Sequence, residues 1–130
     1  MTRRPRIAMI EDNEDNRLLG RALLEDRYDV IEFATGPDGL SGILAEPPDL
    51  VLLDISLPGM DGREVLDHLR ADPRSATLPV VALTAHAMAG DREHLLKLGF
   101  DAYVSKPIVD EQDLLKTIER LLPGREGGLA

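Results

Sequence analysis

The chain contains no cysteine and no tryptophan, and aromatic residues make up only 3% of its 130 positions. The lack of cysteine excludes disulfide bonds, thiolate metal sites and a cysteine nucleophile. The shortage of aromatic residues argues against the stacking platforms that bind single-stranded nucleic acids. No apolar run approaches the roughly 18 residues of a membrane span. The apolar run after Arg6 ends already at Glu11, so the N-terminus does not have the pattern of a signal peptide. We therefore expect a cytoplasmic protein.

Positive charge is also in short supply. Acidic residues outnumber basic ones by 24 to 15, and the formal net charge is −9. Such a surface repels nucleic acids and anionic lipids, so we expect direct binding to neither nucleic acid nor membrane. The length fits one domain, and a hydrophobic content of 43% is sufficient for a buried core.

Five short apolar runs alternate with longer amphipathic segments, and there is no internal repeat. The runs are rich in strand-forming residues and lie at 7–10, 30–33, 50–53, 80–83 and 102–105. Such an alternation predicts a parallel sheet with helices on both faces. The first, third and fourth runs are apolar throughout, as central strands are, whereas Glu32 and Ser105 mark the other two as edges. We predict an α/β, flavodoxin-like (βα)5 fold, a doubly wound five-stranded parallel sheet in the order 2-1-3-4-5.

Two of the predicted helices have clear beginnings. Asn13 is expected to cap the first helix, and Asp110 the last. The residues expected on the apolar face of the first helix are Leu18, Leu19, Ala22 and Leu23.

Two further helices are predicted with different clarity. The fourth is predicted over about 88–98, with Gly99 as its stop signal. The segment after Pro37 is the weakest helix in the sequence, because Gly39 and Gly42 both disfavour helical backbone.

Polar residues follow the predicted strands on the same side of the sheet. Glu11 and Asp12 follow the first strand, Asp54 the third, Thr84 the fourth and Lys106 the fifth. The carboxyl ends of parallel strands share one edge, and sites form there near the point where the strand order reverses. Three carboxylates in one crevice repel one another, and a hard cation such as Mg²⁺ relieves that repulsion.

Phosphoryl transfer is the chemistry that this set of side chains fits. Asp54 can act as a nucleophile and become an acyl phosphate, and Mg²⁺ lowers the cost of bringing an anionic donor beside it. Lys106 offers a positive charge and Thr84 a hydroxyl donor to phosphate oxygens. Each residue alone has an ordinary explanation as a helix cap, turn former or surface charge. Their joint placement at one edge indicates a site.

Four motifs resemble the receiver domains of two-component response regulators. They are IEDN at 10–13, LDISLPGMDG at 53–62, ALTA at 82–85 and YVSKP at 103–107. The resemblance covers a domain expected at 6–122, followed by a flexible tail at 123–130. Stretches such as EDNEDN at 11–16 are most similar to single-domain, DivK-like regulators and to receivers attached to hybrid histidine kinases.

The resemblance implies roles for the residues at this edge. Asp54 would accept a phosphoryl group from the phosphohistidine of a histidine kinase or histidine phosphotransfer protein, in a Mg²⁺-dependent reaction. Asp12, Asp54 and the backbone carbonyl of Ser56 would bind Mg²⁺ directly, and Glu11 mostly through water. Lys106 would pair with the phosphate.

The family also implies a switch. Thr84 would move to the phosphoryl oxygen and Tyr103 would turn inward behind it, altering the face made by the fourth helix, the fifth strand and the fifth helix. A downstream protein would bind that face. The Lys106–Pro107 bond is expected to be cis. The resemblance further implies that the side chains of Ser56 and His86 lie where they can shape the access of water to the acyl phosphate, although an ordinary solvated loop residue explains His86 equally well. The domain would assist its own phosphorylation and slow dephosphorylation without being an enzyme otherwise.

Three other kinds of protein share part of this sequence pattern. The starting Met1 and the loose tail favour an independent protein, but a receiver module cut from a hybrid histidine kinase has the same sequence features. An aspartate-nucleophile phosphohydrolase of the haloacid-dehalogenase type has a second aspartate two residues after the nucleophile, where this chain has Ser56. A receiver that signals without phosphorylation usually lacks an acidic site residue or the lysine, and this chain has them all.

Overall fold

Five parallel strands form one sheet in the computed structural model, which describes residues 4–85, 89–106 and 111–122. The strand order is β2-β1-β3-β4-β5, so the predicted fold class and strand order are confirmed. The two strands predicted as edges, β2 and β5, lie at the edges. The strands are β1 (Arg6–Ile10), β2 (Asp29–Phe33), β3 (Leu50–Asp54), β4 (Val80–Thr84) and β5 (Ala102–Ser105).

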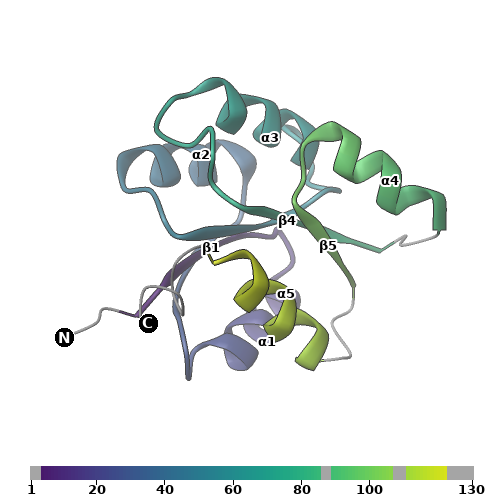
Figure 1. The fold of residues 1–130 in the computed structure, drawn as a ribbon. Coiled ribbons are helices and arrows are strands. Elements are labelled where there is room, and N and C mark those ends of the chain that lie inside the picture. Colours follow the sequence, from purple (N-terminus) through teal and green to yellow (C-terminus); the bar gives the residue numbers. More distant parts are fainter. Residues whose placement is uncertain (1–3, 86–88, 107–110, 123–130) are drawn as a thin grey trace, which may run out of the picture.

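Helices cover both faces of the sheet. Figure 1 shows α2, α3 and α4 on one face, with α1 and α5 on the other. Because each central strand is covered on both sides, its residues are apolar without alternation, and every residue of β3 and β4 is buried. The helices are α1 (Glu14–Leu24), α2 (Gly36–Ala45), α3 (Gly62–Ala71), α4 (Ala89–Leu98) and α5 (Glu111–Leu121).

The apolar face of α1 differs from the prediction. The side chain of Leu18 is 55% exposed and that of Leu19 is 36% exposed, whereas Gly20 and Leu24 are buried. The helix is turned so that Gly20 faces β1, where a Cβ atom would lie 2.7 Å from the Sδ atom of Met9. The close approach of helix and strand depends on a residue without a side chain, and counting apolar side chains could not reveal it.

The helix starts are set by short polar side chains. The Asn13 side chain accepts a hydrogen bond from the Asn16 amide at 2.9 Å, which confirms the predicted cap of α1. Thr35 caps α2 in the same way, at 3.2 Å from the Asp38 amide. Asp110, the predicted cap of the last helix, lies outside the described residues.

The segment that the sequence marks as the weakest helix is helical nonetheless. Added Cβ atoms at Gly39 and Gly42 would lie 2.4 Å from the side chains of Ile10 and Phe33, so close packing on the sheet offsets the poor helix propensity of glycine. Helix α4 ends before Gly99, as predicted. Among the described residues, no helix has both the length and the apolar character needed to cross a membrane.

Candidate functional site

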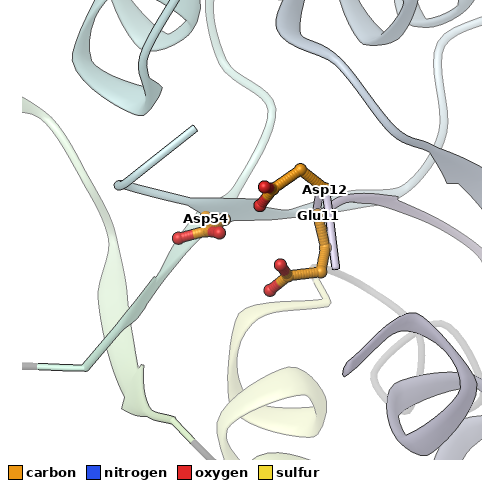
Figure 2. A group of neighbouring side chains, drawn as sticks. All are labelled: Glu11, Asp12 and Asp54. Atoms are coloured by element: carbon orange, nitrogen blue, oxygen red, sulfur yellow. The ribbon is translucent and has the colours of Figure 1, made fainter. Parts of the chain in front are cut away.

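An acidic cluster lies where β1 and β3 end. These strands are neighbours and pair in parallel, with Ile10 opposite Leu53, so Glu11 and Asp12 emerge beside Asp54. One carboxylate oxygen from each of the three residues lies within 4.8 Å of the others. Figure 2 shows the three side chains gathered at this end of the two strands. Glu11 and Asp54 are each 1% exposed, whereas Asp12 is open to solvent. The predicted convergence of the three carboxylates is confirmed.

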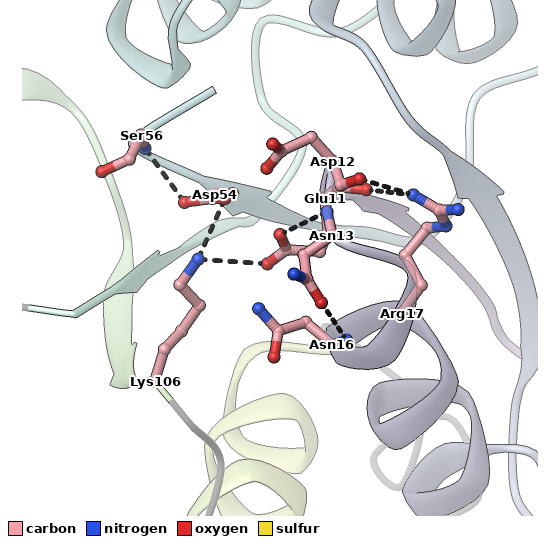
Figure 3. Close-up of polar contacts among 8 residues, drawn as sticks. All are labelled: Glu11, Asp12, Asn13, Asn16, Arg17, Asp54, Ser56 and Lys106. Atoms are coloured by element: carbon pink, nitrogen blue, oxygen red, sulfur yellow. Dashed lines mark hydrogen bonds and ion pairs between the residues drawn. The ribbon is translucent and has the colours of Figure 1, made fainter. Parts of the chain in front are cut away.

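Lys106 supplies the positive charge that faces this cluster. Its Nζ atom lies 3.0 Å from Oδ2 of Asp54 and 3.2 Å from Oε1 of Glu11 (Figure 3). Lys106 directly follows β5, and its amide donates to the carbonyl of Thr84 at 2.8 Å, which extends the pairing of β4 with β5. A lysine from a distant part of the sequence therefore pairs with two nearly buried carboxylates.

The charges in the cluster shift one another's protonation. Burial raises the pKa of the Glu11 carboxyl, and the negative charge of Asp54 acts in the same direction. A hydrogen bond from the Asn13 amide and the nearby Lys106 ammonium lower it, but they do not outweigh burial. Burial also works against the charged form of Lys106, yet its bonds to Asp54 and its attraction to Glu11 win, so the pKa of Lys106 is raised.

The remaining predicted site residues lie around Asp54. The Ser56 amide donates to Oδ1 of Asp54 at 2.9 Å, which fixes the orientation of the carboxylate, while the Ser56 side chain is exposed. Thr84 ends β4 and is 7% exposed. Tyr103 lies on β5, half-buried, opposite Ala82.

Besides Asp110, three predictions concern parts of the chain outside the described residues, namely His86, the peptide bond at 106–107 and the tail at 123–130. The other two histidines, His68 and His94, are exposed on α3 and α4.

The donor set is one that a hard dication prefers. It consists of carboxylate oxygens. Within the part of the chain that the structure describes, Lys106 alone forms ion pairs with these carboxylates, so the cluster retains excess negative charge. Mg²⁺ binds through one or two carboxylates together with water and phosphate oxygens. The residues present therefore fit Mg²⁺.

One residue of the site escaped the sequence reasoning. Nη1 of Arg17 donates to the backbone carbonyls of Glu11 at 2.8 Å and Asp12 at 3.2 Å (Figure 3). The sequence pattern that could have predicted this contact is an arginine one turn into the helix after the acidic pair. A side chain at that position can extend back towards the start of α1. That signal is weak, because arginine is common on exposed helix surfaces.

A carboxylate cluster with an opposed lysine, at the reversal point of a doubly wound sheet, defines a phosphoryl-accepting signalling domain. The sequence agrees, because residues 7–119 match the response regulator receiver domain family. The chain belongs to this family. Receiver domains are signalling phosphoacceptors, generally not enzymes; they bind Mg²⁺ in the acidic site and interact with histidine kinases or phosphotransfer proteins.

Similar proteins occur in two settings. The chain is 42% identical over 115 residues to the sensor protein GacS of Pseudomonas syringae pv. syringae, covering 85% of this chain but 13% of GacS. It is 42% identical over 103 residues to the polar-differentiation response regulator DivK of Brucella ovis, covering 78% of this chain and 84% of DivK. The chain thus spans nearly all of a short regulator but only a small part of a sensor kinase.

A similar solved structure contains the metal. The receiver domain of a sensor histidine kinase from Pseudomonas aeruginosa PAO1 superposes with a TM-score of 0.83 at 30% identity, covering 92% of this chain and 98% of that one. In that structure a magnesium ion is coordinated in the active site cleft.

Proposed function

We propose that this chain is the phosphoacceptor of a two-component or phosphorelay pathway, with Asp54 as the phosphorylated residue and 6–122 as the functional domain. The observation that carries this proposal is the placement of Asp54. Its carboxylate is nearly buried at the end of a central strand, 3.0 Å from the Lys106 ammonium and beside two further carboxylates. A structural aspartate would not need that surrounding.

The proposed reaction moves one phosphoryl group. A carboxylate oxygen of Asp54 forms a bond to phosphorus while the phosphorus–nitrogen bond of the donor phosphohistidine breaks. The electron pair stays on the histidine nitrogen, which takes a proton from water. Lys106 then pairs with an oxygen of the new acyl phosphate, and Thr84 is proposed to donate its hydroxyl to another. Positioning and charge neutralisation supply most of the catalysis in such transfers.

Mg²⁺ is the proposed cofactor of this site. The proposed ligands are Asp12, Asp54 and the backbone carbonyl of Ser56, with Glu11 acting mostly through water. When bound, Mg²⁺ offsets the repulsion between these carboxylates and the incoming phosphoryl group. The excess negative charge of the cluster and its oxygen-only donors support this assignment.

The output surface is proposed to be the face formed by α4, β5 and α5. Tyr103 belongs to a hollow of about 300 Å³ on this face. The hollow also includes the partly exposed Leu96 and charged side chains of both signs, among them Asp113 and Arg120. A surface that mixes apolar and charged groups suits a protein partner better than a small apolar ligand. Movement of Thr84 and Tyr103 on phosphorylation would change this surface.

The phosphoryl donor is proposed to be a histidine kinase or histidine phosphotransfer protein that docks over α1. Leu18 and Leu19 are exposed in the second turn of this helix, which begins directly after the acidic pair. A donor whose phosphohistidine reaches Asp54 must cover the surface around the site, and exposed leucines there offer it apolar contact. The cytoplasmic location expected from the sequence remains a prediction.

The domain is also proposed to assist its own slow dephosphorylation. Hydrolysis requires water to reach the phosphorus atom, and the exposed Ser56 lies beside Asp54 where a side chain can favour or hinder that approach. The lifetime of the phosphorylated state would then depend on residue 56.

Intact-mass measurement tests the proposed function. The chain is incubated with acetyl phosphate, with and without Mg²⁺, alongside the Asp54→Asn variant. We expect a gain of one phosphoryl group that requires Mg²⁺ and is absent in the variant. Labelling of Asp54→Asn to the same extent as the unmodified chain would contradict the assignment of Asp54.

A further inference from the structure

Arg17 holds the backbone from which the acidic pair projects. Its Nη1 atom donates to the carbonyl of Glu11 at 2.8 Å and to that of Asp12 at 3.2 Å. Both carbonyls lie just beyond the end of β1, where the Glu11 amide still donates to the Phe33 carbonyl of β2 at 3.0 Å. One guanidinium nitrogen therefore satisfies two successive peptide carbonyls and sets the orientation of both peptide groups.

The two acidic side chains depend on this backbone to different degrees. The Glu11 carboxylate is fixed by the Asn13 amide at 3.1 Å and by Lys106 at 3.2 Å. The Asp12 carboxylate accepts no hydrogen bond from any of the residues that the structure describes, and it is exposed. Its position beside Asp54 therefore depends mainly on the direction of its own backbone, whose carbonyl accepts a hydrogen bond from Arg17.

Arg17 is in turn anchored to the sheet. Its Nε atom lies 3.5 Å from Oε1 of Glu32 on β2, and Nη1 of Arg21 lies 2.9 Å from Oε2 of the same carboxylate. The side chains of Arg17 and Glu32 are both mostly buried, at 19% and 22% exposed. Glu32 thus offsets the positive charge of Arg17, which would otherwise oppose a divalent cation at the neighbouring site.

We propose that Arg17 is a positioning residue of the cation site, holding the backbone of residues 11 and 12 so that the Asp12 carboxylate is preorganised beside Asp54. This inference rests on the proposed Mg²⁺ site. It adds a requirement outside the ligands themselves, in which α1 and β2 together set the affinity for the cation.

The test is Mg²⁺ binding to the whole chain, measured by isothermal titration calorimetry without any phosphoryl donor. Loss of a group that orients a metal ligand typically weakens metal affinity by about tenfold or more. We expect Arg17→Ala to weaken Mg²⁺ binding by roughly tenfold. Arg17→Lys, which keeps the charge but loses the reach of the guanidinium, should fall between Arg17→Ala and the unmodified chain.

Arg21→Ala is the matched control. Arg21 lies one helical turn further along α1 and pairs with the same Glu32, but its ion pairs are with Glu25 and Glu32 and not with the carbonyls of the acidic pair. We expect its Mg²⁺ affinity to stay within about twofold of the unmodified chain, since an exposed ion pair contributes little. Equal weakening in both variants would overturn the proposal, because charge or helix stability would then explain the effect.

A second readout separates positioning from folding. At saturating Mg²⁺, Arg17→Ala should take phosphate from acetyl phosphate at nearly the unmodified rate, because excess cation restores the occupied site. If Arg17→Ala does not fold, as judged by circular dichroism with EDTA, Arg17→Lys decides. Mg²⁺ affinity of Arg17→Lys equal to that of the unmodified chain overturns the proposal. Failure of the proposed function is distinguishable, because the binding measurement involves no phosphoryl transfer.

Discussion

The Nζ atom of Lys106 lies 3.0 Å from Oδ2 of Asp54, although the two residues are 52 positions apart in the sequence. The ammonium group is the counter-ion of a carboxylate that would otherwise be buried beside two others. After phosphoryl transfer the same ammonium can follow the negative charge from the carboxylate to the phosphoryl oxygens. We therefore propose that one lysine stabilises both the resting site and the phosphorylated product.

Replacement of this lysine should slow phosphorylation without abolishing it. In Lys106→Met the transferred phosphoryl group loses a charged partner, and loss of one such donor typically lowers a rate by about 10²-fold or more. We expect a fall of roughly that size in the rate of mass gain with acetyl phosphate at saturating Mg²⁺. Lys116→Met, at an exposed position on α5, serves as the control. An unchanged rate in Lys106→Met would show that Lys106 has no role in phosphoryl transfer.

On acidification, Mg²⁺ affinity should begin to fall at a higher pH than it would if Glu11 had the pKa of an ordinary glutamate. Burial raises the pKa of Glu11 above its usual value of 4.5, so a proton competes with Mg²⁺ for Glu11 already above that pH. Calorimetric Mg²⁺ titrations from about pH 7 down to about pH 4.5 measure the effect. Glu11→Gln should bind Mg²⁺ more weakly and with a shallower pH dependence. Identical pH profiles for the two proteins would contradict a role for Glu11.

The same shift predicts the sign of a stability change in the metal-free protein. A carboxyl whose pKa is raised in the folded state stabilises the fold below its unfolded pKa, and this contribution is lost as the pH rises through the folded pKa. Relative to the unmodified chain, Glu11→Gln should therefore gain stability as the pH rises from about 4.5 towards 7. Urea denaturation in EDTA measures it. If Glu11→Gln instead lost stability relative to the unmodified chain as the pH rises, the attraction between Glu11 and Lys106 would outweigh the cost of burial.

Thr84 should be needed for the switch more than for phosphorylation. It ends β4 opposite Ser105 of β5, two residues along the strand from Tyr103, and its movement is proposed to be passed to Tyr103. We expect Thr84→Ala to take up phosphate while backbone amide shifts in α4, β5 and α5, recorded by NMR with a phosphoryl mimic, become much smaller. Typical coupling of this kind is about 1–3 kcal/mol. Thr77→Ala, at an exposed position, is the control. Full shifts in Thr84→Ala would exclude Thr84 from the coupling.

The exposed leucines of α1 should affect the rate of phosphoryl transfer from a protein donor but not from a small-molecule donor such as acetyl phosphate. Leu18 and Leu19 are 55% and 36% exposed, so truncating both to alanine removes contact surface with little loss of core packing. We expect transfer from a phosphorylated histidine phosphotransfer protein to slow by about thirtyfold or more, because two leucines that each contribute roughly 1 kcal/mol or more together supply about 2 kcal/mol. Labelling by acetyl phosphate should not change.

Leu96→Ala is the matched control for the leucines of α1. Leu96 is 43% exposed but lies on α4, on the other face of the sheet. Transfer from the protein donor should proceed at the unmodified rate in this variant. Equal slowing by Leu96→Ala would place the donor elsewhere than over α1.

The regular parts of the fold could be predicted because each depends on local pattern. Short apolar runs between amphipathic segments can satisfy both faces of a parallel sheet in few ways. Glu32 and Ser105 were sufficient to identify the edge strands, since the central strands β3 and β4 are apolar up to their last residues, Asp54 and Thr84. The Asn13 cap was predictable for the same reason, because its partner is only three residues away.

The orientation of α1 could not be predicted in this way. Gly20 contributes nothing to an apolar pattern, yet its missing side chain brings the helix against Met9 and leaves Leu18 exposed. In α2, contacts with Ile10 and Phe33 compensate for two glycines that disfavour a helix. In both helices the deciding neighbour lies on a strand, outside the local sequence.

By itself, the sequence determined the order of the elements, the edge at which Glu11, Asp12, Asp54, Thr84 and Lys106 meet, and the family to which those motifs belong. Only the tertiary structure decided which of them touch. It paired Lys106 with both Asp54 and Glu11, left Asp12 exposed, and brought Arg17 back onto two carbonyls of the acidic pair. The physical reason is the sequence separation between the interacting residues. Strand and helix patterns follow from neighbours along the chain, whereas hydrogen bonds and burial depend on distances that exist only after the sheet has formed.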